Sequence, residues 1–210
     1  MSRRVVGVTL DNLEQLPKQC RKCVFWELAP HLREEAEEYG QTDFEKEAWV
    51  SSVLLEWGSC GRVISVSGVP AGYVFYAPPA AVPRAVAFPT RPVSADAVLL
   101  TALKIMPDFE RAGLGRALVQ EVAKDLTGRG VKAVEAFGDA APDHASSCVV
   151  PADFLRSVGF KTVRPHPRWP RLRLELRTAL SWKEDVEAAL ERLLGTVTIH
   201  TAEPAPAPVR

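Results

Sequence analysis

The chain has 210 residues, of which 47% are hydrophobic and 25% are charged, the composition of a soluble globular protein. Its 26 basic residues balance 26 acidic ones. A net charge near zero gives no general reason to expect nucleic acid or a membrane surface as a partner. No apolar stretch approaches the roughly 18 residues that a bilayer span requires.

The N-terminal segment and the cysteines indicate a cytoplasmic protein. The apolar run Val5 to Leu10 is too short for the core of a secretory signal, and polar residues follow it. In the cytoplasm the four cysteines are expected to be reduced thiols. A chain of this length buries roughly 70% of its unfolded surface, so it needs neither a disulfide nor a metal to hold its core.

The N-terminal quarter of the chain predicts one strand and two helices. Val5 to Leu10 is apolar and β-branched, which suits a strand, and Asn12 to Cys20 suits a short helix. Thr42 to Glu45 has the spacing of a capping box, so a longer helix is expected to begin there, run to Trp57 and stop at Gly58. The expected buried face of this helix carries Phe44, Ala48 and Leu55.

The middle of the chain predicts a hairpin, a long loop and a strand–helix–strand unit. The expected strands are Arg62 to Ser67, Ala71 to Ala77, Ala97 to Ile105 and Val131 to Phe137. The Pro- and Ala-rich segment Pro78 to Pro92 is too long for a tight connection, and loops of this length are usually functional. From Leu114, apolar residues three and four apart mark an amphipathic helix ending near residues 128–130.

The C-terminal third predicts a short helix, two strands and a final helix. These elements are Ala152 to Val158, Lys161 to Arg164, Leu172 to Leu176, and a helix that opens at the capping box Ser181 to Glu184. We expect one domain over residues 1–178, an amphipathic helix over 179–195 and an extended tail over 196–210, disordered from 203 to 210. The order of elements indicates an α/β (α+β) domain whose mixed central sheet has about six to seven strands flanked by helices.

The segment from Leu103 to Leu118 carries the clearest functional signal. A buried strand ends, a loop with Gly113 and Gly115 follows, and a helix begins at once. The first turn of a helix has free N–H groups and the positive end of the dipole. The two glycines remove β-carbons that would keep a pyrophosphate away, and Arg111 and Arg116 add positive charge. The segment therefore predicts an anion site.

Two other glycine-rich nucleotide sites fit the sequence poorly. A P-loop requires the run G-x-x-x-x-G-K-[ST], which the chain lacks. A Rossmann fingerprint requires a third glycine where Leu118 stands, and it follows a first strand rather than the middle of the chain.

The same segment resembles motif A of the GNAT N-acetyltransferases, [Q/R]-x-x-G-x-[G/A], placed after a turn of the form V-x-P. Here the turn is Ile105-Met106-Pro107, and the motif is Glu110 to Gly115. The segment Phe154 to Phe160 is similar to a later family segment, F-Y-x-x-x-G-F, and the hairpin resembles the second and third strands of the family. The resemblance covers about Val5 to Leu176 and implies the GNAT fold.

The resemblance implies acetyl-CoA as cosubstrate, with the pantetheine arm along the strand and the pyrophosphate on the loop. The residues implied in binding are Leu103, Lys104, Ile105, Arg111, Ala112, Gly113, Leu114, Gly115 and Arg116. The acetyl carbonyl would lie in a splay between the strand ending at Ile105 and the strand Val131 to Phe137. In most such enzymes an acceptor amine attacks the thioester directly.

The sequence departs from the family pattern at three points. Glu110 replaces the first glutamine or arginine of the motif, Leu155 stands where a tyrosine often protonates the leaving thiolate, and Leu99-Leu100 replaces the strand glutamate that serves some members as base.

Two other residues are candidates for catalysis. Glu135 is expected beside the thioester as a base, or else faces solvent or pairs with an arginine. Cys148 is expected near the CoA sulfur as an acid, or else is an ordinary buried residue.

Cys20 and Cys23 have the spacing of a metal or redox motif, and Cys60 is the nearest further cysteine in sequence. A structural zinc site usually needs four ligands, and no second C-x-x-C pair is present, so we assign no metal site. A thiol-based sensor built on these three cysteines remains an alternative to plain packing.

The sequence therefore favours an acetyl-CoA-dependent N-acetyltransferase whose acceptor is a small-molecule or protein amine. The alternative is a catalytically silent acyl-CoA-binding module of the same fold, with a regulatory or interaction role. The acidic segment Arg33 to Glu38 is either a solvated helix face or a feature that favours a cationic acceptor. A homodimer is left open, because the apolar stripe of Ser181 to Leu194 could cover this sheet or a partner's.

Overall fold

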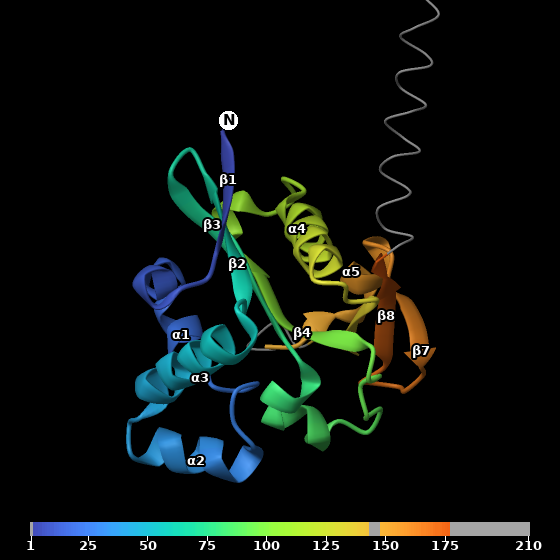
Figure 1. The fold of residues 1–210 in the computed structure, drawn as a ribbon, viewed down its shortest axis with the longest axis horizontal. Coiled ribbons are helices and arrows are strands. Elements are labelled where there is room, and N and C mark those ends of the chain that lie inside the picture. Colours follow the sequence, from blue (N-terminus) through green and yellow to red (C-terminus); the bar gives the residue numbers. More distant parts are fainter. Residues whose placement is uncertain (1, 143–147, 177–210) are drawn as a thin grey trace, which may run out of the picture.

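The computed structural model describes residues 2–142 and 148–176. Eight strands in this part of the chain form one sheet, in the order β1-β2-β3-β4-β5-β8-β7 with β6 beside β5 (Figure 1). The mixed α/β fold predicted from the sequence is confirmed. One strand more than expected is present, because β6 has only two residues and leaves no pattern in the sequence. The helix expected over 179–195 and the tail over 196–210 lie outside the described residues.

The strands are β1 (Arg3–Gly7), β2 (Gly61–Val66), β3 (Val69–Ala77), β4 (Ala97–Ile105), β5 (Ala133–Asp139), β6 (Val150–Pro151), β7 (Lys161–Arg164) and β8 (Arg171–Glu175). The α-helices are α1 (Lys18–Arg21), α2 (Pro30–Glu38), α3 (Thr42–Trp57), α4 (Leu114–Gly128) and α5 (Ala152–Ser157). Short 3₁₀ turns are η1 (Leu10–Gln15), η2 (Pro79–Ala81), η3 (Pro83–Ala87) and η4 (Pro107–Phe109). Strands β4 and β5 are parallel, as are β5 and β6, and the other pairs are antiparallel.

The helices cover the sheet from two sides. Figure 1 shows α4 and α5 together on one side and α1, α2 and α3 on the other. One hydrophobic cluster joins α4 and α5 to the sheet through residues such as Val98 and Val134. The second joins α1 and α3 to residues such as Phe75, Leu99 and Phe137. The alternation of side chains along the strands divides the core in this way.

Helix α4 confirms the amphipathic pattern predicted for it. Leu114, Leu118, Val122 and Leu126 are all almost fully buried. Their spacing of four places them on one face of the helix, and this face packs against β2, β3 and β4.

Helix α3 has the predicted length and ends at Gly58, whose φ of 82° lies in the left-handed region. Two details of the prediction were wrong. The residue before the first turn is Gln41, so Thr42 does not form a capping box. Phe44, Ala48 and Leu55 are all exposed. The buried positions are Lys46, Val50 and Val53.

The buried face of α3 was missed because it begins with a lysine. The Lys46 ammonium forms an ion pair with Glu27, and both side chains are buried. The ammonium also lies 4.8 Å from the centre of the Phe75 ring. A charge is tolerated in the interior when it is paired in this way, so a search for apolar residues alone does not find this face.

The expected helix Asn12 to Cys20 is divided into η1 and α1. Pro17 precedes the first turn of α1 and lacks the backbone N–H that a continuous helix would need. Within the described ranges, no helix combines the length and the apolar character needed to cross a membrane.

Replacing Leu118 by alanine tests the packing of α4. We expect the free energy of unfolding to fall by about 2–5 kcal/mol, because Leu118 is 0% exposed and its removal leaves a cavity. Urea unfolding followed by circular dichroism measures the change. The matched control is Leu55→Ala, because Leu55 is 84% exposed and its loss is expected to cost less than about 0.5 kcal/mol. Equal losses in the two variants would contradict the assignment of the buried face.

Candidate active site

Strands β4 and β5 pair over a short distance and then separate. The described pairing joins Ala97 to Ala133, Val98 to Val134 and Leu99 to Glu135. Beyond this point β5 pairs with β6 and β8, whereas β4 pairs with β3 alone among the strands of residues 2–142 and 148–176. The backbone of β4 from Leu100 to Ile105 therefore presents a free edge toward β5, the splay expected from the sequence.

A β-bulge lies at the start of this free edge. Thr101 and Ala102 of β4 stand opposite the single residue Phe75 of β3. Thr101 is 1% exposed, and its hydroxyl has no hydrogen-bond partner among the described residues. A buried hydroxyl without a partner is unfavourable, so this position suits a polar group of a ligand. The sequence did not indicate Thr101, because a bulge cannot be seen in an apolar run.

The loop before α4 leaves the first helical N–H groups open. Gly113 precedes the helix with φ of 73°, and no side chain of the described residues caps the helix. The first helical hydrogen bond runs from Ala117 N to Gly113 O, so the N–H groups of Leu114, Gly115 and Arg116 precede it. A β-carbon at Gly113 would meet nothing within 4 Å. This geometry is suited to an anion.

The physical reason for a glycine at position 115 differs from the reason at position 113. A β-carbon at Gly115 would lie 2.9 Å from two ring atoms of Phe154 and 3.7 Å from Leu103. The second glycine of the motif therefore permits close packing of α4 against α5. The sequence predicts that both glycines let an anion approach the helix. In the structure, a β-carbon would have open space around it at Gly113 but not at Gly115.

Three arginines surround the loop, one more than the sequence indicated. Arg111 is exposed and has a positive φ of 60°. Arg116 donates a hydrogen bond of 2.6 Å to the Ser157 carbonyl at the end of α5. Arg3, from the edge strand β1, donates one of 3.1 Å to the Ala112 carbonyl. The sequence did not indicate Arg3, because it lies 109 positions away from Ala112 in the chain.

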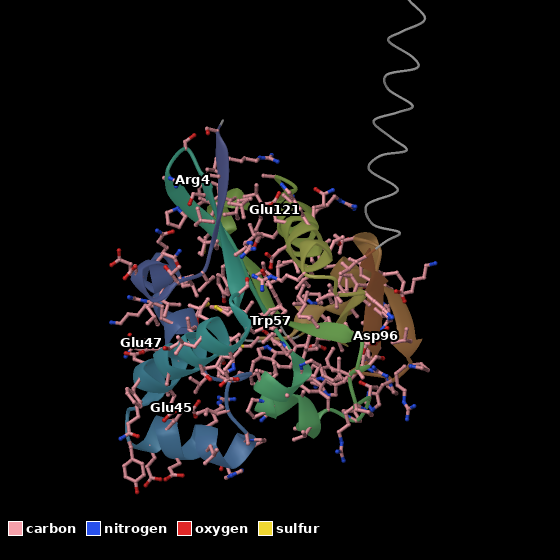
Figure 2. All side chains as sticks on the ribbon, in the orientation of Figure 1. Arg4, Glu45, Glu47, Trp57, Asp96 and Glu121 are labelled. Carbon is pink, nitrogen blue, oxygen red and sulfur yellow. The ribbon has the colours of Figure 1, made fainter. Side chains whose placement is uncertain are left out.

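Glu135 is the last residue of β5 that pairs with β4, and its carboxylate is fully engaged. One oxygen accepts from Arg171 and from the Ser94 N–H, and the other accepts from Arg173 at 3.2 Å. Arg173 also binds Asp96 at 2.9 Å, and Figure 2 shows Asp96 on the side of the molecule formed by β7 and β8. Each oxygen of this buried carboxylate accepts a hydrogen bond from an arginine, so neither is left without a partner. The geometry favours the arginine-paired alternative for Glu135.

Cys148 lies against Cys23, with 2.9 Å between the two sulfur atoms. The hydrogen bond to Cys23 and burial raise the pKa of the Cys148 thiol. The hydrogen bond from Cys148 lowers the pKa of Cys23 to about 6, against the opposing effect of burial. The pairing of Cys23 with Cys148 was not predicted, because the two residues lie 125 positions apart in the sequence.

The other two cysteines do not join this pair. Cys20 and Cys60 are both buried, and burial raises the pKa of Cys60 to about 12. Among residues 2–142 and 148–176, no group of three or more histidine, cysteine or acidic side chains is arranged to hold a metal ion.

Aromatic rings surround the thiol pair. The Trp26 indole donates a hydrogen bond of 2.8 Å to the Cys148 carbonyl. Its ring stacks on Phe88 at 5.2 Å and on Phe137 at 6.4 Å between ring centres. The Arg84 guanidinium lies 4.4 Å from the centre of the Phe25 ring. These side chains come from the segment after α1, from η3 and the residue that follows it, and from β5. Trp26, Phe88 and Phe137 belong to the cluster on the face of the sheet opposite α4.

Together these features describe a site for an elongated ligand with an extended amide arm and a phosphate group. The free edge of β4 can pair with an extended arm as an added strand. The uncapped start of α4 and the arginines beside it can hold the phosphate. Acyl-CoA thioesters have this chemical form, so the geometry is compatible with a ligand of this class.

Comparison with known families agrees with this class. The family model described as the acetyltransferase (GNAT) family matches residues 21–160, which is two thirds of the chain. The chain belongs to the GNAT acetyltransferase family. A search of curated proteins finds no match.

Solved structures share the fold at low sequence identity. The PaiA N-acetyltransferase of Thermoplasma acidophilum, solved in complex with coenzyme A, is 13% identical with a TM-score of 0.56, and the alignment covers 83% of this chain and 99% of that one. A putative GNAT acetyltransferase of Desulfovibrio desulfuricans is 19% identical with a TM-score of 0.52 and the same coverage. An N-acetyltransferase of Staphylococcus aureus Mu50 is 13% identical with a TM-score of 0.55, covering 84% and 99%. At these identities the likeness shows the fold.

The role of Glu135 can be tested by removing its carboxylate. Glu135→Ala is expected to lower the free energy of unfolding by about 3–5 kcal/mol, because it leaves the buried Arg171 without its partner. Thermal and urea unfolding measure the loss. Glu175→Ala is the control, because Glu175 also binds Arg173 but its side chain is 55% exposed, and it is expected to cost less than about 1 kcal/mol. A stable Glu135→Ala protein that binds acetyl-CoA but has lost turnover would instead support a catalytic base.

Proposed function

We propose that this protein is an acetyl-CoA-dependent N-acetyltransferase that transfers the acetyl group directly to an amine in a ternary complex. The observation that carries the proposal is the separation of β4 from β5 immediately beside the uncapped start of α4. Leu103 on the free edge of β4 lies beside Gly115 in the first turn of α4, so one elongated ligand can use both features. Acetyl-CoA supplies an acyl group activated as a thioester.

The free edge of β4 and the loop before α4 divide the binding of acetyl-CoA between them. The backbone of Leu103, Lys104 and Ile105 pairs with the amides of the pantetheine arm. The N–H groups of the loop and of the first turn of α4, from Arg111 through Ala112, Gly113, Leu114 and Gly115 to Arg116, receive the pyrophosphate. The side chains of Arg3 and Arg111 add positive charge, and Arg116 ties the loop to α5.

The acceptor enters from the face that carries the thiol pair and the aromatic rings. Attack by a neutral amine on the thioester forms the C–N bond, breaks the C–S bond and leaves one proton to be removed from nitrogen and one thiolate to be protonated. Cys148 is the candidate donor to the thiolate, because a thiol can donate a proton and the strand β6 that follows it pairs with β5 beyond the point where β4 and β5 part. The buried hydroxyl of Thr101 has no partner among the described residues, and we expect it to hydrogen-bond a polar group of the acyl arm.

A catalytically silent acyl-CoA-binding module is the second candidate. Two observations favour it: Leu155 is fully buried in the position where the family often has a tyrosine, and Glu135 is held by two arginines. Turnover of acetyl-CoA with a panel of small amines and N-terminal peptides separates the two candidates. Chromatographic detection of CoA suits this assay, because a thiol reagent would also modify the protein's cysteines. Binding without turnover of any acceptor would favour the silent module.

The cofactor site is tested by placing a carboxylate at Gly113. We expect Gly113→Glu to weaken acetyl-CoA binding at least about tenfold, because the new charge lies where the pyrophosphate meets the helix. Calorimetric titration measures the dissociation constant. Gly130→Glu is a matched control, because Gly130 follows the other end of α4 with φ of 75° and a β-carbon there would also meet nothing within 4 Å. Equal binding by both variants, or no binding by the native protein, would overturn the assignment.

The proposed acid is tested by Cys148→Ala. Removal of a general acid is expected to lower kcat by about 10²–10⁴-fold while the dissociation constant for acetyl-CoA stays unchanged. Cys23→Ala serves as the comparison, because it removes the neighbouring thiol but leaves the proton on Cys148. Steady-state kinetics on the accepted amine measure both. If the two variants lose turnover equally, or neither loses it, Cys148 is not the acid.

A further inference from the structure

The thiol pair Cys23–Cys148 has the geometry of a reactive site in its own right. The two sulfur atoms lie 2.9 Å apart, and a disulfide requires about 2.05 Å. The two residues come from distant segments, one after α1 and the other before β6. Both side chains are half-buried, so small molecules can reach them.

Packing on both sides holds the two segments together. The Trp26 indole binds the Cys148 carbonyl and is itself 2% exposed between Phe88 and Phe25. Val24, next to Cys23, is 1% exposed. The sulfurs are thus brought together by the core around them, and closing a bond between them needs little movement of the backbone.

The remaining thiols are poorer partners for Cys23. Cys20 lies one turn earlier in the chain, but it is buried, and Cys23 faces Cys148 rather than Cys20. Cys60 is fully buried. The C-x-x-C spacing groups Cys23 with Cys20 in the sequence, whereas the structure places Cys23 against Cys148.

The surroundings make the two thiols unequal. The hydrogen bond from Cys148 and the charge of Lys46 lower the pKa of Cys23, while burial and the charge of Glu27 act in the opposite direction. The hydrogen bond to Cys23 and burial raise the pKa of Cys148. The thiolate is the form that attacks a disulfide, so Cys23 is the attacking sulfur and Cys148 the resolving one.

We infer that Cys23 and Cys148 form a dithiol–disulfide exchange site that reacts with small-molecule disulfides. The Cys23 thiolate attacks one sulfur of the small disulfide, forms a mixed disulfide and releases the first small thiolate. The Cys148 thiol then loses its proton and attacks the Cys23 sulfur, which forms the internal disulfide and releases the second small thiol. Two protein thiols are oxidised and one small disulfide is reduced to two thiols. The exchange reaction does not require acetyl transfer, but it consumes Cys148, the acid proposed for that transfer, so the oxidised protein is expected to lose turnover.

The test exposes the full-length protein to oxidised glutathione at pH 6, followed by alkylation of free thiols and peptide mass spectrometry without reduction. The expected product is one cross-linked peptide pair containing Cys23 and Cys148, with Cys20 and Cys60 alkylated, and dithiothreitol reverses it. A Cys20–Cys23 cross-link, a lasting mixed disulfide on the native protein, or no reaction would each overturn the inference.

Two substitutions of Cys148 separate its two roles. Cys148→Ser keeps a hydrogen-bond donor but has no thiol to attack the mixed disulfide. The reaction is therefore expected to stop at a mixed disulfide on Cys23. Cys148→Ala also removes the donor, so Cys23 is expected to react roughly tenfold more slowly at pH 6, as an ordinary thiol does. Equal rates in the two variants would contradict the activation of Cys23 by Cys148.

Cys20→Ser is the matched control and is expected to form the 23–148 cross-link at the native rate. Circular dichroism of each variant establishes that it is folded before its thiols are compared. Should a Cys148 variant fail to fold, the cross-link formed by the native protein and by Cys20→Ser still decides the inference. Because the readout is a covalent bond, its outcome does not depend on whether an amine acceptor has been found.

Discussion

The early end of pairing between β4 and β5 is the constraint on which the site depends. Three residue pairs join the two strands, and the last of them brings Glu135 to the point where they part. There Arg171 and Arg173 of β8 form ion pairs with the carboxylate. Arg173 also forms an ion pair with Asp96, in the segment that leads into β4. This cluster of charges lies at the point of separation, and each of its members is paired. Beyond it, β4 presents a free edge among the described strands.

The sequence predicted most of the fold because its elements carry strong local patterns. The apolar run of β4, the four-residue spacing of α4 and the turn between β2 and β3 depend on residues close in the chain. The prediction failed where the burial of a residue depends on a partner far away in the sequence. Lys46 is buried because Glu27 neutralises it, and no periodicity in α3 indicates this.

In the candidate site, too, the features that could be predicted are those that depend on residues close together in the sequence. The glycine loop could be predicted, since its chemistry lies within one short segment. The role of Glu135, the partner of Cys23, and the contribution of Arg3 could not, because each depends on residues at least 36 positions away. Thr101 was hidden for another reason: the bulge that sets it apart is a property of how β3 and β4 align, and the run of side chains around it stays apolar.

The distance in sequence between partners also bears on the order of folding. The hairpin of β2 and β3 and helix α4 form from neighbouring residues, whereas Arg3 meets Ala112 across 109 residues and Cys23 meets Cys148 across 125. Contacts of this kind close large loops, and their entropic cost is met only once the rest of the sheet is in place. We expect the binding loop and the thiol pair to be completed late in refolding, so that a compact chain with native secondary structure precedes a chain able to bind its ligand.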